Sequence, residues 1–169
     1  MTALHNVPRY ETIKAHAHRY PELDATAVEA FLVLMQVAGD TTAALDAHLA
    51  RHDISQGRFT ILMLLKRSGE GMASPSELAE SAGVTRATVT GLLDGLERDQ
   101  LIQRSHSTHD RRAIGVHLTE KGRRFIEEIL PDHFRRISRL MQHLSEPERK
   151  QLIQLLGKVS QGLPAMINE

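Results

Sequence analysis

The chain has 169 residues, and its 21 Lys and Arg side chains balance its 21 Asp and Glu side chains. This length predicts one ordinary domain, with or without helical arms, and 41% hydrophobic with 25% charged residues is typical of a globular protein. The sequence contains no cysteine, which excludes disulfides, thiolate metal sites, cysteine nucleophiles and cysteine-based oxidation sensing. The first ten residues lack an apolar signal core, and no apolar run is long enough for a membrane helix, so we expect a cytoplasmic protein.

Apolar residues recur every three or four positions through most of the chain, which predicts a mainly α-helical fold. Residues 1–24 are weakly patterned and form an N-terminal arm, in which Glu11–Arg19 favours a short helix. A long amphipathic helix is expected from Ala25 to about His52. A second, more apolar helix follows a cap-like start and ends near Ser68.

Two short helices separated by a tight turn are predicted at about 74–98. Ser74-Pro75-Ser76-Glu77 matches a capping box, with proline at the first helical position. Gly83 suits the end of that helix, and Thr85 suits the start of the next one, which is expected over Arg86–Asp99. Two helices joined in this way are typical of a helix-turn-helix.

A β-hairpin is predicted directly after these helices, at about 101–118. Its strands are expected at Leu101–Arg104 and Ala113–Leu118, where apolar residues alternate with polar or small ones. The combination indicates a winged helix-turn-helix over residues 53–118. Two further helices are expected after Thr119, the first interrupted by a kink at Pro131.

The outer face of the second short helix suits a DNA groove. Its small side chains allow close approach, its threonines can contact phosphates or thymine methyl groups, and Arg86 can read guanine or bind phosphate. A solvated helix face is the alternative interpretation of this pattern. The candidate DNA-binding residues on the two short helices and their caps are Ser74, Ser76, Thr85, Arg86, Ala87, Thr88, Thr90 and Arg98.

Three segments occur in the order and spacing of a known family. Val84–Arg98, His109-Asp110-Arg111-Arg112 and Leu118–Gly122 together resemble the MarR family of bacterial transcription regulators, and the overall arrangement is most similar to its multidrug-responsive branch. The resemblance implies a homodimer formed through residues 25–52 and 119–165. It also implies that the second short helix enters the major groove of double-stranded DNA at a pseudo-palindromic operator.

The resemblance assigns further roles in the wing and in ligand binding. It implies that Arg111 or Arg112 reaches the minor groove and that Asp110 positions the wing through an ion pair. A repressor released by a small aromatic or lipophilic effector is therefore expected. Candidate residues for the effector pocket are His16, Arg19, Tyr20 and Arg58.

The neutral net charge is unusual for a DNA-binding protein. Residues 102–112 carry three arginines, including Arg104, against one aspartate, which gives an expected local charge of +2. We therefore expect binding to rest on few phosphate contacts together with groove contacts, and to weaken as salt is added.

Two alternative functions remain open on the sequence. A winged-helix module that binds a protein partner and not DNA is compatible with the neutral charge. Ten histidines, including His48 and His52 four residues apart, permit a metal-responsive regulator of the same fold, with the other candidates at His16, His18, His106, His109 and His117. We predict no catalytic site, no resident cofactor and no bound metal, because no phosphate loop or catalytic constellation is present.

Overall fold

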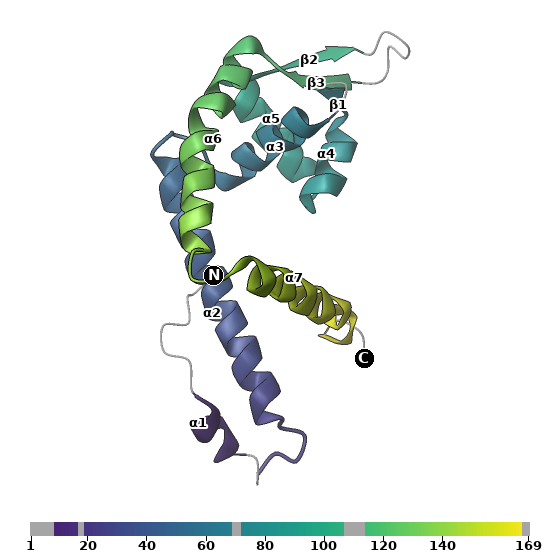
Figure 1. Cartoon of the computed structure of the whole chain (residues 1–169). Coiled ribbons are helices and arrows are strands. Elements are labelled where there is room, and N and C mark those ends of the chain that lie inside the picture. Colours follow the sequence, from purple (N-terminus) through teal and green to yellow (C-terminus); the bar gives the residue numbers. More distant parts are fainter. Residues whose placement is uncertain (1–8, 17–18, 69–71, 107–113, 167–169) are drawn as a thin grey trace. The chain divides into compact units, whose positions relative to one another are not determined.

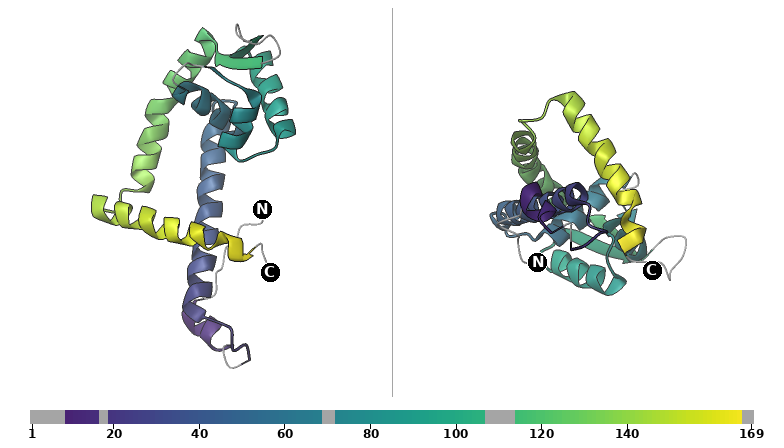
Figure 2. Two further views of the ribbon diagram at one scale, coloured as in Figure 1. Left: turned by 90° about the vertical axis from the view of Figure 1, so that its right-hand side faces the viewer. Right: turned by 90° about the horizontal axis from the view of Figure 1, so that it is seen from below.

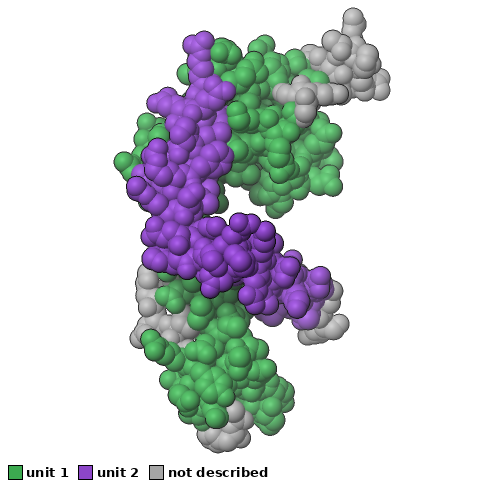
Figure 3. Space-filling view, in the orientation of Figure 1, with its two compact units in different colours: residues 1–123 green, residues 124–169 purple. Residues whose placement is uncertain are grey.

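The structure, a computed structural model, describes residues 9–16, 19–68, 72–106 and 114–166 (Figure 1). It is mostly helical with one small antiparallel sheet, which confirms the predicted fold class. Two compact units, residues 1–123 and 124–169, divide the chain within helix α6 (Figure 3). In chain order the elements are α1 (Tyr10–Lys14), α2 (Ala25–Ala50), α3 (Gln56–Arg67), β1 (Met72–Ala73), α4 (Pro75–Ala82), α5 (Arg86–Arg98), β2 (Ile102–His106), β3 (Ile114–Leu118), α6 (Glu120–Leu140), α7 (Glu146–Gln161) and the 3-10 helix η1 (Leu163–Met166).

Helices α1 and α2 form the N-terminal part of the first unit. The Asp24 side chain accepts hydrogen bonds from the first amides of α2, which fixes where that helix begins. Helix α1 is shorter than the predicted Glu11–Arg19, and its Ile13 is buried. The two helices are joined by a hydrogen bond of 3.0 Å from the Tyr10 amide to a Glu29 carboxylate oxygen.

Helix α2 has an unusually apolar and exposed surface. By length and hydropathy it alone, among the described ranges, could cross a membrane, a property that core helices of water-soluble proteins share. Its buried residues are near its ends: Ala25 at the start, and His48 and Leu49 at the C-terminal end. Large apolar side chains along its middle, among them Phe31 and Val37, are exposed in the single chain.

The core of the first unit lies among α3, α4, α5 and the sheet, which stay together in both views of Figure 2. Helix α3 begins at the Ser55 cap and ends at Ser68, as the sequence pattern predicted. The fully buried side chains of this core are large and aliphatic, and burying each of them stabilises the fold by about 1.5–3 kcal/mol. They include Leu62, Leu65, Leu78, Val89, Leu93, Leu96, Ile102 and Val116.

The sheet has three strands in the order β1-β3-β2. Strands β2 and β3 form the predicted hairpin, with Ile102 opposite Leu118 and His106 opposite Ile114. Strand β1 was not predicted, because two residues are too few to show an alternating pattern; it pairs Met72 with His117. Met72 also lies across Gly115, where any side chain would collide with its sulfur atom.

The start of α6 is held tightly against the end of α5. The Thr119 hydroxyl accepts a hydrogen bond from the Gly122 amide and donates one to the Gln100 carbonyl oxygen. Gly122 is required here, because a Cβ atom would overlap the Leu101 carbonyl oxygen. Helix α6 continues through Pro131 to Leu140, and Glu148 then accepts from the amide and hydroxyl of Ser145 at the start of α7.

Candidate nucleic-acid interface

Helix α4 begins with the capping box that the sequence predicted. The Ser74 hydroxyl accepts from the Glu77 amide at 3.2 Å, and the Glu77 carboxylate accepts from the Ser74 amide at 2.7 Å. The hydrogen bond from the Ser74 amide, together with the nearby Ser74 side chain, lowers the pKa of Glu77. The helix ends at Gly83, whose φ of 65° is left-handed and favours glycine. Ser76 is exposed on the first turn.

The N-terminal end of helix α5 is organised by threonines. The Thr85 hydroxyl accepts from the Thr88 amide at 3.2 Å, and the two hydroxyl oxygens are 2.9 Å apart. One turn further, the Thr90 hydroxyl donates to the Arg86 carbonyl oxygen at 3.0 Å. The hydroxyl oxygens of Thr88 and Thr90 each keep acceptor capacity for a further hydrogen bond.

Helix α5 divides cleanly into a buried and an exposed face. Val89, Leu93 and Leu96 are buried in the core of the unit. The residues on the other face are small, hydroxyl-bearing or charged, and all of them are exposed: Thr85, Arg86, Ala87, Thr88, Thr90, Gly91, Asp94 and Arg98. This face can approach a polyanionic groove closely at its N-terminal end, where backbone amides favour anions.

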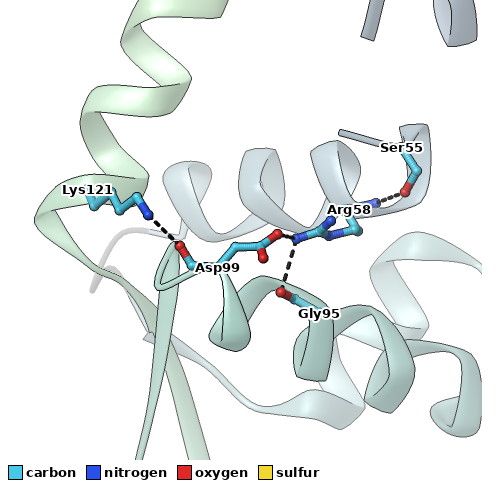
Figure 4. Close-up of polar contacts among 5 residues, drawn as sticks. All are labelled: Ser55, Arg58, Gly95, Asp99 and Lys121. Carbon is cyan, nitrogen blue, oxygen red and sulfur yellow. Dashed lines mark hydrogen bonds and ion pairs between the residues drawn. The ribbon is translucent and has the colours of Figure 1, made fainter. Parts of the chain in front are cut away.

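The C-terminal end of α5 is held by two cations from other helices (Figure 4). From α3, Arg58 Nη2 donates to the Gly95 carbonyl oxygen at 3.0 Å and forms an ion pair with the Asp99 carboxylate. From α6, Lys121 Nζ donates to the Asp99 carbonyl oxygen at 2.8 Å. The hydrogen bond from Arg58 lowers the pKa of Asp99, and the charges of Arg58, Arg98 and Lys121 act in the same direction.

Strand β2 is linked to α5 by a second set of ion pairs. Arg104 Nη2 is 2.6 Å from an Asp94 carboxylate oxygen, and Arg104 Nη1 is 3.4 Å from Glu97. The Arg104 amide also donates to Glu97 at 3.2 Å. The formal charge of +2 over residues 102–112 includes Arg104, which this contact pairs with carboxylates from outside that range. Two carboxylates from α5 surround this arginine, so its charge is compensated within the protein.

The remaining predicted site residues lie in different parts of the chain. The wing residues Asp110, Arg111 and Arg112 lie outside the described residues, so their roles stay predictions. His16, Arg19 and Tyr20 are exposed next to the N-terminal end of α2, whereas Arg58 follows its C-terminal end. Since the 26 residues of α2 span about 39 Å, one chain does not bring Arg58 together with the arm.

The described histidines do not form a metal site. Within the described ranges, no three His, Asp or Glu side chains gather closely enough to hold an ion. The rings of His48 and His52 meet edge to face, with centroids 5.4 Å apart. His18 and His109, which belong to the metal hypothesis, lie outside the described residues.

Sequence reasoning missed the contacts of Arg58 and Arg104 with α5. Each of these contacts joins two elements that are distant in the sequence, and the spacing of apolar residues does not predict such pairs. One signal was present: Gly95 lies inside a helix, where glycine costs about 1 kcal/mol relative to alanine, so it needs a reason such as a close neighbour.

A helix-turn-helix followed directly by a β-hairpin, with its second helix exposed, defines a winged helix-turn-helix DNA-binding protein. Comparison with known proteins places this chain within that class. A model of the MarR family matches residues 54–114. The chain is 39% identical over 160 residues to the HTH-type transcriptional repressor YetL of Bacillus subtilis, covering 95% of this chain and 96% of the relative. The chain therefore belongs to the MarR family of DNA-binding transcription regulators.

Solved structures of family members share this fold. The MepR–DNA complex of Staphylococcus aureus superposes with a TM-score of 0.70 at 24% identity, covering 78% of this chain and 94% of MepR. BpsR of Bordetella bronchiseptica, whose DNA binding is regulated by 6-hydroxynicotinic acid, superposes with a TM-score of 0.56 at 26% identity. That superposition covers 72% of this chain and 98% of BpsR.

Proposed function

We propose that this regulator is a cytoplasmic homodimeric repressor that binds a pseudo-palindromic operator and is released by a small aromatic or lipophilic ligand. The observation that carries the proposal is the exposed face of α5, with its threonine-lined N-terminal end. In this proposal, each protomer inserts α5 into a major groove and Arg111 or Arg112 of the wing into the adjacent minor groove, with Asp110 positioning the wing. Two-fold symmetry then sets the two half-sites about 34 Å apart.

The side chains at the N-terminal end of α5 are suited to two kinds of contact, one with bases and one with phosphates. Arg86 is exposed in the first turn, where it can form a bidentate contact with guanine. Ala87 and Gly91 lack long side chains, so the helix can lie deep in the groove. The hydroxyls of Ser74, Ser76, Thr85, Thr88 and Thr90 can donate to phosphates, and Thr90 does so by giving up its hydrogen bond to the Arg86 carbonyl oxygen. Such contacts set the register of the protein on the duplex. Arg98 completes the proposed set at the far end of the helix.

Exposed apolar side chains support a dimer. They occur on α2 in the first unit and on α6 and α7 in the second, which are the helices through which the resemblance implies dimerisation. An isolated soluble chain rarely exposes so many large apolar residues on its helices. The exposed residues are Phe31, Val33 and Val37 on α2, Phe134, Ile137 and Leu140 on α6, and Ile153, Leu155, Leu156 and Val159 on α7.

An aromatic ligand is supported by the relative BpsR, whose DNA binding responds to 6-hydroxynicotinic acid. In the proposed dimer, His16, Arg19 and Tyr20 of one protomer and Arg58 of the other are candidates for the pocket. Arg19 already lies 5.9 Å from the centre of the Tyr20 ring, a pairing of cation and aromatic face that suits an aromatic carboxylate. Such a ligand releases DNA by favouring a half-site spacing that does not fit the operator.

The test is to select duplexes from a random-sequence library with the purified full chain. Fluorescence anisotropy then compares the selected duplex with a scrambled duplex of the same composition across a salt series. We expect a preference of at least 10³-fold that weakens as salt rises, and light scattering should give a dimer. Salicylate should release the selected duplex.

Two results would change the proposal. If no duplex is enriched at any salt concentration, the operator model fails and the alternative of a winged-helix module that binds a protein takes its place. If Zn²⁺ releases DNA and salicylate does not, the regulator responds to a metal and the aromatic effector is rejected.

A further inference from the structure

The cluster at the C-terminal end of α5 joins three helices within the first unit. Arg58 reaches from α3 to a carbonyl oxygen and a carboxylate of the α5 terminus, and Lys121 reaches the same terminus from the first turn of α6 (Figure 4). Both cations lie at the negative end of the α5 dipole, which favours positive charge. The end of α5 opposite Arg86 and the Thr85 cap is therefore held from two sides.

Gly95 shows that the Arg58 side chain is built into the packing of α5. A Cβ atom at Gly95 would lie 3.4 Å from Arg58 Nε and 3.6 Å from Arg58 Cζ. The guanidinium thus occupies the space that a larger residue at this position would fill. A Cβ atom alone would touch Arg58 at ordinary contact distance, whereas a side chain longer than that of alanine would have to displace the guanidinium. The Arg58 side chain is only 21% exposed, in contrast to an ordinary surface ion pair.

The position of this cluster matters because a change in the angle of α5 at this end moves the side chains at its other end. Its 13 residues extend about 20 Å, with the held terminus at one end and Arg86 at the other. Hydrogen bonds to base edges tolerate only a few tenths of an ångström, whereas contacts of charges with phosphates tolerate more. A small tilt of α5 about its held end would therefore disturb base reading before it disturbs non-specific attraction to DNA.

We propose that Arg58 and Asp99 are positioning residues for sequence-specific DNA binding, which fix the angle of α5 from the end that does not touch the bases. The proposal rests on the proposed function, in which α5 reads the major groove. Arg58 acts here through Asp99 and the Gly95 carbonyl and contacts no DNA. It therefore sets the ratio of specific to non-specific affinity, whereas a phosphate-binding residue sets both affinities together.

The experiment measures binding of the full chain to two duplexes, one selected by the wild-type protein from a random library and a scrambled one. The variants are Arg58→Met, which keeps an unbranched apolar stem without the guanidinium, and Asp99→Asn, which removes the charge of a side chain that is 48% exposed. We expect each to lose about tenfold or more of its affinity for the selected duplex and less than twofold for the scrambled one. The double variant should be no worse than either single one, because the two residues act as a pair.

Two further variants distinguish a positioning role of Arg58 from a general effect of losing one positive charge, and circular dichroism excludes an effect of unfolding. Arg67→Met removes the same charge from an exposed position of α3 and should leave the affinity ratio unchanged. Arg58→Lys keeps the ion pair but loses the planar fork that also reaches Gly95, so it should restore part of the ratio. Circular dichroism confirms that every variant is folded at the temperature of the assay.

The outcomes distinguish this inference from the proposed function. If the wild-type chain selects no duplex, the proposed function fails before any variant is tested. If a duplex is selected but folded Arg58→Met and Asp99→Asn variants keep the wild-type ratio, the positioning role is overturned. Equal losses on both duplexes would also overturn it, because they would identify Arg58 as a direct phosphate contact.

Discussion

Arg104 of β2 lies against Asp94 of α5, with its Nη2 atom 2.6 Å from a carboxylate oxygen. The pair connects the strand that leads into the wing with the exposed face of the helix proposed to enter the major groove. Glu97 contributes a second carboxylate to the same guanidinium. The charges of these three side chains therefore leave one net negative charge on a surface that is proposed to meet DNA.

Asp94→Asn should increase non-specific affinity for DNA. The change removes a negative charge from the exposed face of α5 and releases Arg104 from one of its two carboxylates. Binding to a scrambled duplex should tighten, and the slope of log affinity against log salt should become steeper by up to about one unit. Anisotropy titrations at several salt concentrations measure both quantities. The variant should remain folded, because an exposed ion pair contributes about 1 kcal/mol or less to stability. Unchanged binding to the scrambled duplex would show that Asp94 faces away from the DNA.

Arg86→Ala should weaken binding to the selected operator by about 1–3 kcal/mol, the range for a bidentate contact with a base. Arg86 is exposed in the first turn of α5, beside the Thr85 cap. Competition assays on single-base variants of the operator should show relaxed specificity at one position of each half-site. Arg67→Ala, on the exposed end of α3, controls for the loss of charge. A matching loss on scrambled DNA would reassign Arg86 to phosphate binding.

The local parts of this site could be read from the sequence, whereas its long-range contacts could not. Ser74, Gly83 and Thr85 each form capping hydrogen bonds with neighbours within one turn of the chain. Their residue types therefore predict where α4 begins and ends and where α5 begins. Arg58 and Asp99 are 41 residues apart and meet only after α3 packs on α5. The pairing of Arg104 could not be predicted for the same reason, because the carboxylates that compensate its charge belong to another element.

Replacement of the wing arginines should weaken operator binding while the protein stays folded. Arg111→Ala and Arg112→Ala are motivated by the Asp-Arg-Arg motif and by the attraction of arginine to a narrow minor groove. A loss of about 1–3 kcal/mol in one of them identifies the residue that enters the groove. Operators with the minor-groove sequence changed from A·T to G·C provide the control. If both variants bind as tightly as the wild-type chain, the wing takes no part in recognition.

Leu156→Glu should convert the dimer into a monomer. Leu156 and its neighbour Leu155 are exposed on α7, among the apolar residues assigned to the dimer interface. A buried carboxylate without a partner costs several kcal/mol, enough to dissociate a dimer at micromolar concentration. Light scattering coupled to size exclusion measures the mass, and Lys158→Glu on the polar side of the same helix is the control. A dimeric Leu156→Glu protein would place the interface elsewhere.

Gln100→Gly should stabilise the fold. Gln100 follows the end of α5 with a φ of 60°, a left-handed conformation that favours glycine. The turn is closed by a hydrogen bond of 2.9 Å from the Leu101 amide to the Leu96 carbonyl oxygen, so the conformation is set by the helix end. Relief of the strain should raise the free energy of unfolding by about 0.5–1 kcal/mol, after the greater freedom of glycine in the unfolded chain is subtracted.

The matched variant for this prediction is Gly83→Ala at the end of α4. Gly83 has nearly the same conformation, with a φ of 65°, and no atom lies within 4 Å of the Cβ position. The substitution therefore changes backbone strain alone and should lower the free energy of unfolding by about 1 kcal/mol. Urea unfolding followed by circular dichroism measures both variants. Opposite signs are required: if Gln100→Gly destabilises the protein as Gly83→Ala does, the side chain of Gln100 contributes more than its backbone strain costs.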